Sequence, residues 1–219
     1  MNSSLYPDVH KVCGPFEWFD AIYYINMDTA TDRLNTFRSK LKILGIEQRA
    51  IRFAAVPTAE SHHIGCALSH RTIIAEAHRQ GLNNVLVLED DAIFHREIFD
   101  LLPVMLDKLS SIDWDLFYFG GHAWGRKGEL VENCNNLRRP EVLTCTHAVL
   151  YNHTVFTRLL HDLPASRIQM KQWLKIWKGI DQYLSMSNFH KTLAEPMIAM
   201  QVELFDQPGV PDRALFNVR

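Results

Sequence analysis

Apolar positions along the chain form short strand-like runs that alternate with longer segments of helical spacing. The run from Ala21 to Asn26 is apolar and aromatic, which predicts a buried strand. Four apolar residues then recur at helical spacing: Leu34, Phe37, Leu41 and Leu44. Gly45 ends that pattern, and residues 49–56 form a second strand-like run. The chain therefore opens as a strand–helix–strand unit, which is typical of nucleotide-binding α/β folds.

The same alternation continues through the rest of the chain. We predict helices over residues 66–80, 95–109 (interrupted or bent by Pro103) and 155–163, with another from residue 179. We predict strands over residues 85–88, 113–119 and 142–151, with a short one near 197–202. Residues 122–140 are polar and predict a loop. The pattern indicates one α/β domain with a mostly parallel central sheet flanked by helices.

Composition and charge narrow the class of protein. The 219 residues are 47% apolar and 22% charged, as expected for a globular protein, and the formal net charge of −2 argues against a broad surface for nucleic acid. The four cysteines lack zinc-ribbon spacing, which indicates free thiols in a reducing compartment. No apolar run is long enough to cross a bilayer. We expect a cytoplasmic protein, for which contact with a membrane surface stays open.

Three consecutive acids follow the most apolar strand. Glu89, Asp90 and Asp91 come directly after the run Val85–Leu88. Ligands of open α/β sheets bind at the carboxyl ends of such strands, and a divalent cation would relieve the repulsion among three carboxylates. The alternative is a solvated acidic turn, or acids that cap the next helix.

A second polar segment follows the first strand. Asn26 and Asp28 lie in the turn between strand and helix, and Arg33 lies in the first turn of the helix. Free N–H groups at a helix start suit a nucleotide phosphate, to which Arg33 would add charge. Ordinary helix capping by the acids of this segment, with a surface Arg33, is the alternative.

Two further segments carry candidate chemistry. Cys66 and His70 are spaced to share a metal on a helix. The preferred interpretation is that Gly65 allows close backbone approach and that Ser69 and His70 contact a polar ligand. Asp181 follows Gly179 at a helix start, where a carboxylate can act as a general base or serve only as a cap.

The order of these segments resembles glycosyltransferase family 25, which includes lipooligosaccharide and collagen galactosyltransferases. The matching motifs are I-N-M-D-x-x-x-D-R, G-C-x-L-S-H, V-L-E-D-D and W-D-L-F-Y-F-G-G, in that order between residues 25 and 121. The resemblance implies a GT-A-like fold in a single domain. It would comprise an N-terminal arm (1–19), a nucleotide-sugar-binding half (20–121) and an acceptor-side half (122–219).

The resemblance also implies site roles. Glu89 and Asp91 would bind Mn²⁺ (or Mg²⁺), and Asp90 would support them. Asn26, Asp28 and Arg33 would line the pocket of a UDP-sugar donor, with Ser69 and His70 beside a sugar. Inverting transfer needs a base for the acceptor hydroxyl, for which Asp181 is the first candidate and Asp115 the second.

The implied reaction moves a sugar, with galactose as the family default, to a glycan or glycolipid acceptor such as lipooligosaccharide. The segment Thr29–Thr31 stands where the family usually has basic residues, which weakens the expected phosphate contacts. Two alternatives stay open: a nucleotidyltransferase or phosphohydrolase that uses the same acids, and an inactive module that binds a sugar nucleotide. The basic and aromatic stretch 171–178 predicts either contact with sugar or membrane, or packing against the sheet.

Overall fold

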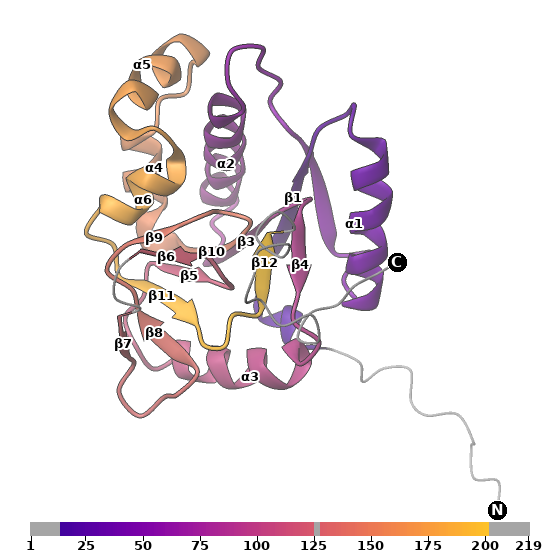
Figure 1. The fold of residues 1–219 in the computed structure, drawn as a ribbon, viewed down its shortest axis with the longest axis vertical. Helices are drawn as coiled ribbons and strands as arrows, with labels where there is room; N and C mark the ends of the chain where they lie inside the picture. The colour runs from indigo at the N-terminus through magenta and orange to yellow at the C-terminus, as the bar shows by residue number, and fades with distance from the viewer. Residues whose placement is uncertain (1–13, 125–127, 202–219) are drawn as a thin grey trace, which may run out of the picture.

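An eight-stranded sheet with helices on both faces lies at the centre of the molecule (Figure 1). The computed structural model describes residues 14–124 and 128–201. The strand order is β2-β1-β3-β10-β5-β11-β8-β7. The strands are β1 (Ala21–Asn26), β2 (Ala50–Ala54), β3 (Asn84–Glu89), β5 (Leu116–Tyr118), β7 (Glu129–Leu130), β8 (Leu137–Arg139), β10 (Ala148–Asn152) and β11 (Lys191–Ala194).

Six of these eight strands run in one direction. β2, β1 and β3 are mutually parallel, and β10 is antiparallel to both β3 and β5. β5 and β11 are parallel, β8 opposes β11, and β7 opposes β8. Only β10 and β8 are therefore reversed among the eight strands of the described sheet. This confirms the predicted α/β architecture, with a mostly parallel central sheet flanked by helices.

Two antiparallel pairs of short strands lie outside this sheet. β4 (Ala92–Phe94) pairs with β12 (Ala199–Gln201), and β6 (His122–Ala123) pairs with β9 (Leu143–Thr144). The β4–β12 pair brings the end of the described chain beside the three acids. The segment 122–140, predicted as a loop, contains three short strands, β6, β7 and β8. β8 lies inside the large sheet, between β11 and β7.

Helices cover the sheet on both sides because strand residues alternate between two apolar clusters. Leu86 and Leu88 pack with α1 (Thr31–Ile43), α3 (Ile98–Leu109) and the 3-10 helix η1 (Pro15–Trp18). Val85 and Val87 pack on the other face with α2 (His62–Arg79) and with α4 (Phe156–Asp162), α5 (Arg167–Trp177) and α6 (Ile180–Met186). A second 3-10 helix, η2 (His153–Val155), precedes α4. Figure 1 shows α4, α5 and α6 grouped beside α2, away from α1.

Several element boundaries differ from the sequence-based ones. α2 begins four residues earlier than predicted, at His62, because the Ser61 side chain accepts a hydrogen bond from the His63 N–H. α3 begins at Ile98, since residues 92–94 form β4, and it continues through Pro103. Among the described residues, no helix has the length and apolar character needed to cross a membrane.

Part of the predicted N-terminal arm belongs to the core. Phe16 and Phe19 are buried in the cluster that contains α1 and α3. Residues 1–13, 125–127 and 202–219 lie outside the described residues, and with them Cys13, the rest of the arm, part of the 122–140 loop and the C-terminal tail.

Candidate functional site

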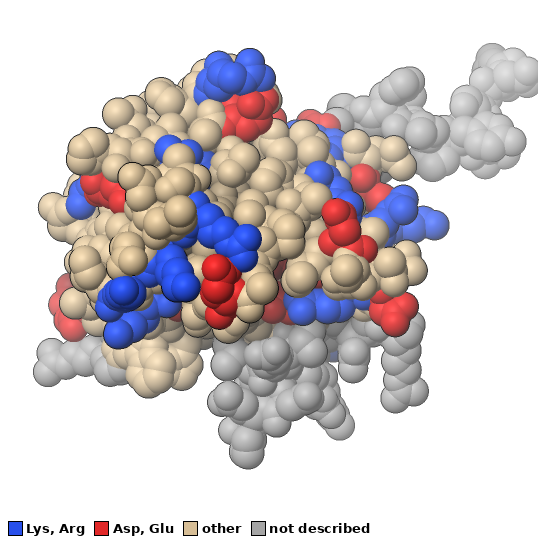
Figure 2. Space-filling view, turned by 90° about the horizontal axis from the view of Figure 1, so that it is seen from above, with Lys and Arg blue, Asp and Glu red and all other residues tan. Residues whose placement is uncertain are grey.

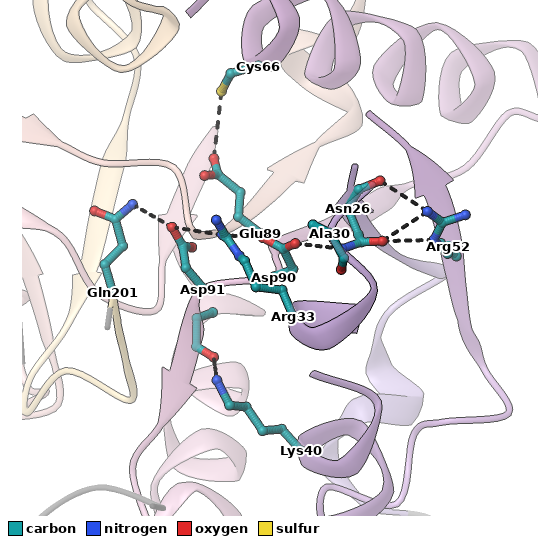
Figure 3. A network of polar contacts seen from close by, with 11 residues as sticks. Asn26, Ala30, Arg33, Lys40, Arg52, Cys66, Glu89, Asp90, Asp91 and Gln201 are labelled. Carbon is teal, nitrogen blue, oxygen red and sulfur yellow. Dashed lines mark hydrogen bonds and ion pairs between the residues drawn. The ribbon is translucent and has the colours of Figure 1, made fainter. Parts of the chain in front are cut away.

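The carboxyl ends of two parallel strands bring the predicted polar segments together (Figure 3). Ile25 of β1 is in register with Glu89 of β3, and the Asp90 N–H donates to the Ile25 carbonyl at 3.2 Å. Asn26 therefore lies directly beside the acids, although 64 positions separate it from Asp90 in the sequence. This is the edge of the sheet at which open α/β folds bind ligands.

Asp90 is the acid that links the two strands. Its Oδ2 accepts a hydrogen bond from Asn26 Nδ2 at 2.7 Å, and its Oδ1 is paired with Arg33 of α1. The Oδ1 of Asn26 accepts two hydrogen bonds from Arg52 of β2, at 2.9 and 3.1 Å. Asp28 is largely exposed and is paired with Arg52 at 2.7 Å. Both carboxylate oxygens of Asp90 thus have protein partners, which suits the predicted supporting role.

Asp91 has an oxygen without a partner. Its Oδ2 lies 3.3 Å from Gln201 Nε2 and 3.6 Å from Arg33, whereas its Oδ1 is buried and has no hydrogen-bond partner among the described residues. Burial, followed by the nearby charge of Glu89, raises the pKa of Asp91 to about 6. An unpaired buried carboxylate oxygen is costly, and a divalent cation would satisfy it.

The Glu89 side chain extends toward Cys66 of α2 (Figure 3). Its Oε1 accepts a hydrogen bond from Thr146 at 2.7 Å and lies 3.3 Å from Nε2 of His70. Burial acts to raise the pKa of Glu89, but the hydrogen bond and charge of His70, with Thr146, outweigh it and hold this pKa below its usual value. The chemistry of Glu89 and Asp91, two carboxylates of which one retains an unpaired oxygen, fits a metal such as Mn²⁺ or Mg²⁺.

Ser69 and His70 are buried beneath the site. The Ser69 hydroxyl accepts from the Val56 N–H at 3.0 Å and donates to the Gly65 carbonyl at 2.7 Å. His70 is fully buried, with Tyr151 OH 2.9 Å from its Nδ1. In this structure both residues position α2 and Glu89, and their predicted contact with a sugar stays a prediction.

Gly65 fulfils the close approach that its position in the sequence predicts. A Cβ at this residue would lie 2.4 Å from the carbonyl oxygen of Val56, in the segment between β2 and α2. Only glycine fits this contact without displacing the segment. The close contact holds the start of α2 against the end of β2.

The structure separates the two candidate general bases. Asp181 lies in the first turn of α6, and its Oδ2 accepts from the Cys145 N–H at 3.4 Å. α6 packs with α2 on one face of the sheet, and Glu89 extends toward α2, so Asp181 lies on the Glu89 side. Asp115 precedes β5 at the opposite edge, where its oxygens accept from the His190 N–H and from Thr154, each at 2.8 Å. The structure does not bring Asp115 to the acids.

Besides Thr146, four residues near the acids have no counterpart among the predicted site residues. Lys40 of α1 is buried and donates to the Ala92 carbonyl at 2.8 Å. Burial lowers the pKa of Lys40, against the opposing effect of Asp91 and Asp90. The other three are Arg52, Gln201 and His147. A charged residue inside an apolar strand or on the apolar face of a helix is the only sequence signal for Arg52 and Lys40.

His147 lies directly across from Glu89. The Glu89 N–H donates to the His147 carbonyl at 2.8 Å, which extends the pairing of β3 and β10. The His147 ring is fully buried, and neither nitrogen has a partner within the described part of the chain. The buried hydroxyl of Tyr118 also lacks one there, and burial, followed by the charge of Asp181, raises the pKa of Tyr118. The Tyr118 hydroxyl and the His147 ring are thus two buried polar groups without partners among the described residues.

The surface carries charge of both signs. Figure 2 shows lysines and arginines interspersed with acidic residues over the face that lies uppermost in Figure 1. This mixture agrees with the small net charge of the chain. A face of this kind offers local pockets for anions rather than a broad basic surface.

Comparison with known proteins identifies relatives of this chain. The profile of the family described as "Glycosyltransferase family 25 (LPS biosynthesis protein)" matches residues 15–154. Procollagen galactosyltransferase 2 of Homo sapiens is 34% identical over 92 residues, which are 40% of this chain and 14% of the human protein.

Two solved structures resemble the chain at low sequence identity. One is a glycosyltransferase involved in the glycosylation of the major capsid of PBCV-1, with 12% identity, a TM-score of 0.44, and coverage of 65% of this chain and 64% of the other. Another is mannose-1-phosphate geranyltransferase from Thermus thermophilus, with 12% identity, a TM-score of 0.40, and coverage of 80% and 72%.

Proposed function

Because the chain belongs to glycosyltransferase family 25, we propose that it moves a sugar, galactose in the first instance, from a UDP-sugar to a hydroxyl group of a glycan acceptor such as lipooligosaccharide. The choice of galactose rests on the similarity to the human galactosyltransferase, and that of acceptor on the description of the family. The observation that carries the proposal is the buried oxygen of Asp91, unpaired within the described structure, beside Arg33 at the carboxyl end of β3.

Glu89 and Asp91 are the residues that would hold Mn²⁺ or Mg²⁺. When bound, the cation would neutralise the charge that grows on the diphosphate as the glycosidic bond breaks. Asp90 is committed to Asn26 and Arg33, so it fixes the turn that presents its two neighbours. The proposed roles of the three acids thus differ because their carboxylate oxygens differ in hydrogen-bond partners.

The nucleotide would lie over the loop between β1 and α1. Asn26 and Arg52 form a fixed polar floor there, and Asp28 lies at its exposed rim. The Arg33 side chain is 55% exposed, so it can turn from Asp90 and Asp91 toward a diphosphate. Guanidinium and phosphate form strong charge-assisted hydrogen bonds.

Asp181 would act as the general base of an inverting displacement. The acceptor oxygen attacks the anomeric carbon as the bond to the diphosphate breaks, and the electron pair of that bond leaves with UDP. The hydroxyl proton passes to the Asp181 carboxylate. The Cys145 N–H holds that carboxylate in place, on the Glu89 side of the sheet.

The outer face of α5 would provide contact with a membrane surface for a cytoplasmic enzyme with a glycolipid acceptor. Ile168 and Ile176 are 78% and 74% exposed, and Lys171 and Lys175 lie on the same helix. Exposed apolar side chains beside lysines suit the interface of an anionic membrane. Trp173 and Trp177 instead pack, partly buried, against Tyr183 of α6, which agrees with the core-packing interpretation for these two rings.

A donor panel tests the proposed reaction. The purified chain is incubated with UDP-sugars and oligosaccharide acceptors, with Mn²⁺ or with a chelator. We expect UDP release and a glycosylated product that depend on the metal and fall at least 100-fold in Asp91→Asn, which keeps the shape of the side chain. Release of pyrophosphate from nucleoside triphosphates without sugar transfer would replace this proposal with a nucleotidyltransferase. Binding of UDP-sugar without turnover would indicate an inactive module.

A further inference from the structure

α2 places a sulfur atom and an imidazole nitrogen, both possible metal ligands, beside the Glu89 carboxylate. Cys66 and His70 lie one helical turn apart on the face that packs against the sheet. The Cys66 Sγ is 3.7 Å from Glu89 Oε1, and His70 Nε2 is 3.3 Å from the same oxygen (Figure 3 shows the Cys66 contact). The three ligand atoms all lie within 4.8 Å of one another.

These separations suit a tetrahedral zinc ion. Bond lengths of about 2.3 Å to sulfur and about 2.0–2.2 Å to nitrogen or oxygen place the ligands of one ion about 3.3–3.6 Å apart. The two contacts to Glu89, at 3.7 and 3.3 Å, need to change by only a few tenths of an ångström. Mn²⁺ and Mg²⁺ prefer oxygen ligands, so a set with thiolate and imidazole selects a different metal.

Neighbouring side chains form hydrogen bonds that hold His70 and Glu89 in orientations suited to metal binding. Tyr151 OH lies 2.9 Å from Nδ1 of His70, so a proton on Nδ1 can be donated to Tyr151 while Nε2 stays free for a metal. Thr146 donates to Glu89 Oε1 at 2.7 Å. His147, across from Glu89 in the sheet, is buried with both ring nitrogens unpaired in the described structure, which makes this a place where polar groups lack partners.

We propose that Cys66, His70 and Glu89 form a binding site for Zn²⁺ or a similar thiophilic divalent cation. On binding, the Cys66 thiol releases its proton to solvent, and thiolate, imidazole nitrogen and carboxylate oxygen become three ligands, with a fourth position open. Glu89 is shared with the proposed Mn²⁺ site. Zn²⁺ at this site therefore removes a ligand from Mn²⁺ and inhibits sugar transfer, a consequence that rests on the proposed function, whereas the binding itself does not.

Cobalt is the probe for this site, because Co²⁺ replaces Zn²⁺ and a thiolate ligand gives it a charge-transfer absorption band. Titration of the full chain with Co²⁺ should give that band with one ion per chain, and one equivalent of Zn²⁺ should abolish it. Cys66→Ser should lose the band and bind Zn²⁺ at least 10-fold more weakly in calorimetry. Cys134→Ser, which changes another partly buried free cysteine, should behave as wild type.

The outcomes separate the two metal proposals. A cobalt spectrum without a thiolate band, or a band that survives in a Cys66→Ser variant of unchanged melting temperature, overturns the zinc site. Electron paramagnetic resonance of Mn²⁺ tests the sharing: added Zn²⁺ should release bound Mn²⁺ from wild type and not from Cys66→Ser. Independent binding of both ions would disprove sharing, while a thiolate band without any Mn²⁺ binding would support the zinc site and disprove the manganese role.

Discussion

The role of each acid follows from its hydrogen-bond partners. Asp90 has protein partners on both carboxylate oxygens, Glu89 has partners on one, and Asp91 retains a buried oxygen with none among the described residues. Three adjacent residues of similar chemistry therefore differ in what they can still bind. The same test distinguishes Asp181, which accepts one long hydrogen bond, from Asp115, whose two oxygens are both occupied.

Replacement of Asp181 by Asn tests the general base. Asp181→Asn keeps the acceptor for the Cys145 N–H but cannot take a proton, so we expect kcat to fall about 10²–10⁴-fold with little change in donor binding. Asp115→Asn is the matched control, because Asp115 lies at the far edge of the sheet. Steady-state kinetics with a metal-loaded enzyme measures both variants. Equal loss of activity in the two, at unchanged melting temperatures, would contradict the assignment.

Arg33→Gln tests the diphosphate contact. The side chain is more than half exposed, so its loss should leave the melting temperature nearly unchanged. We expect the KM for the UDP-sugar to rise about 10-fold or more, because a charge-assisted hydrogen bond is lost. Arg38→Gln, which changes an exposed arginine later in α1, should leave KM unchanged. A normal KM in Arg33→Gln would remove Arg33 from the donor site.

At the scale of elements, the close contact between α2 and the segment after β2 sets the position of Cys66, Ser69 and His70. In Gly65→Ala the added methyl group would meet the Val56 carbonyl at 2.4 Å. We expect a loss of about 1–3 kcal/mol in the free energy of unfolding, as is typical of overpacked sites. Gly14→Ala, where nothing lies within 4 Å of the added atom, should be nearly neutral. Urea unfolding of both variants measures the difference, and equal stability would show that α2 shifts freely.

The sequence predicts local elements well and their long-range partners poorly. Val85–Leu88 is apolar on both faces, so its assignment to a central strand needs no knowledge of its neighbours, and the acids after it follow. Three residues reach the site only through hydrogen bonds to partners 24 to 110 positions away in the sequence: Lys40, Arg52 and Gln201. The local pattern of apolar and polar residues does not predict such contacts. The antiparallel direction of β10 is a further long-range property, because its alternation of residues is the same in either direction.

At the scale of the whole molecule, α5 would orient the enzyme toward a membrane. We expect the chain to bind vesicles that contain phosphatidylglycerol and to be released by added salt, because lysines beside exposed isoleucines combine charge with apolar contact. Co-sedimentation measures the bound fraction. Ile176→Ser together with Lys175→Glu should reduce it severalfold, whereas Lys108→Glu on α3 should not. Equal vesicle binding by wild type and both variants would show that the membrane contact does not involve α5.

The reversed strand β10 has a consequence for the folding of the nascent chain. β3, which ends in the acids, lies between β1 and β10, and β10 is completed only at Asn152. A nascent or truncated chain that ends before β10 would expose β3 as an unpaired edge with a run of buried-type apolar residues, a template for aggregation. The family match ends at residue 154, just after β10. The matched segment therefore includes, besides the motifs, the strand that protects this side of β3.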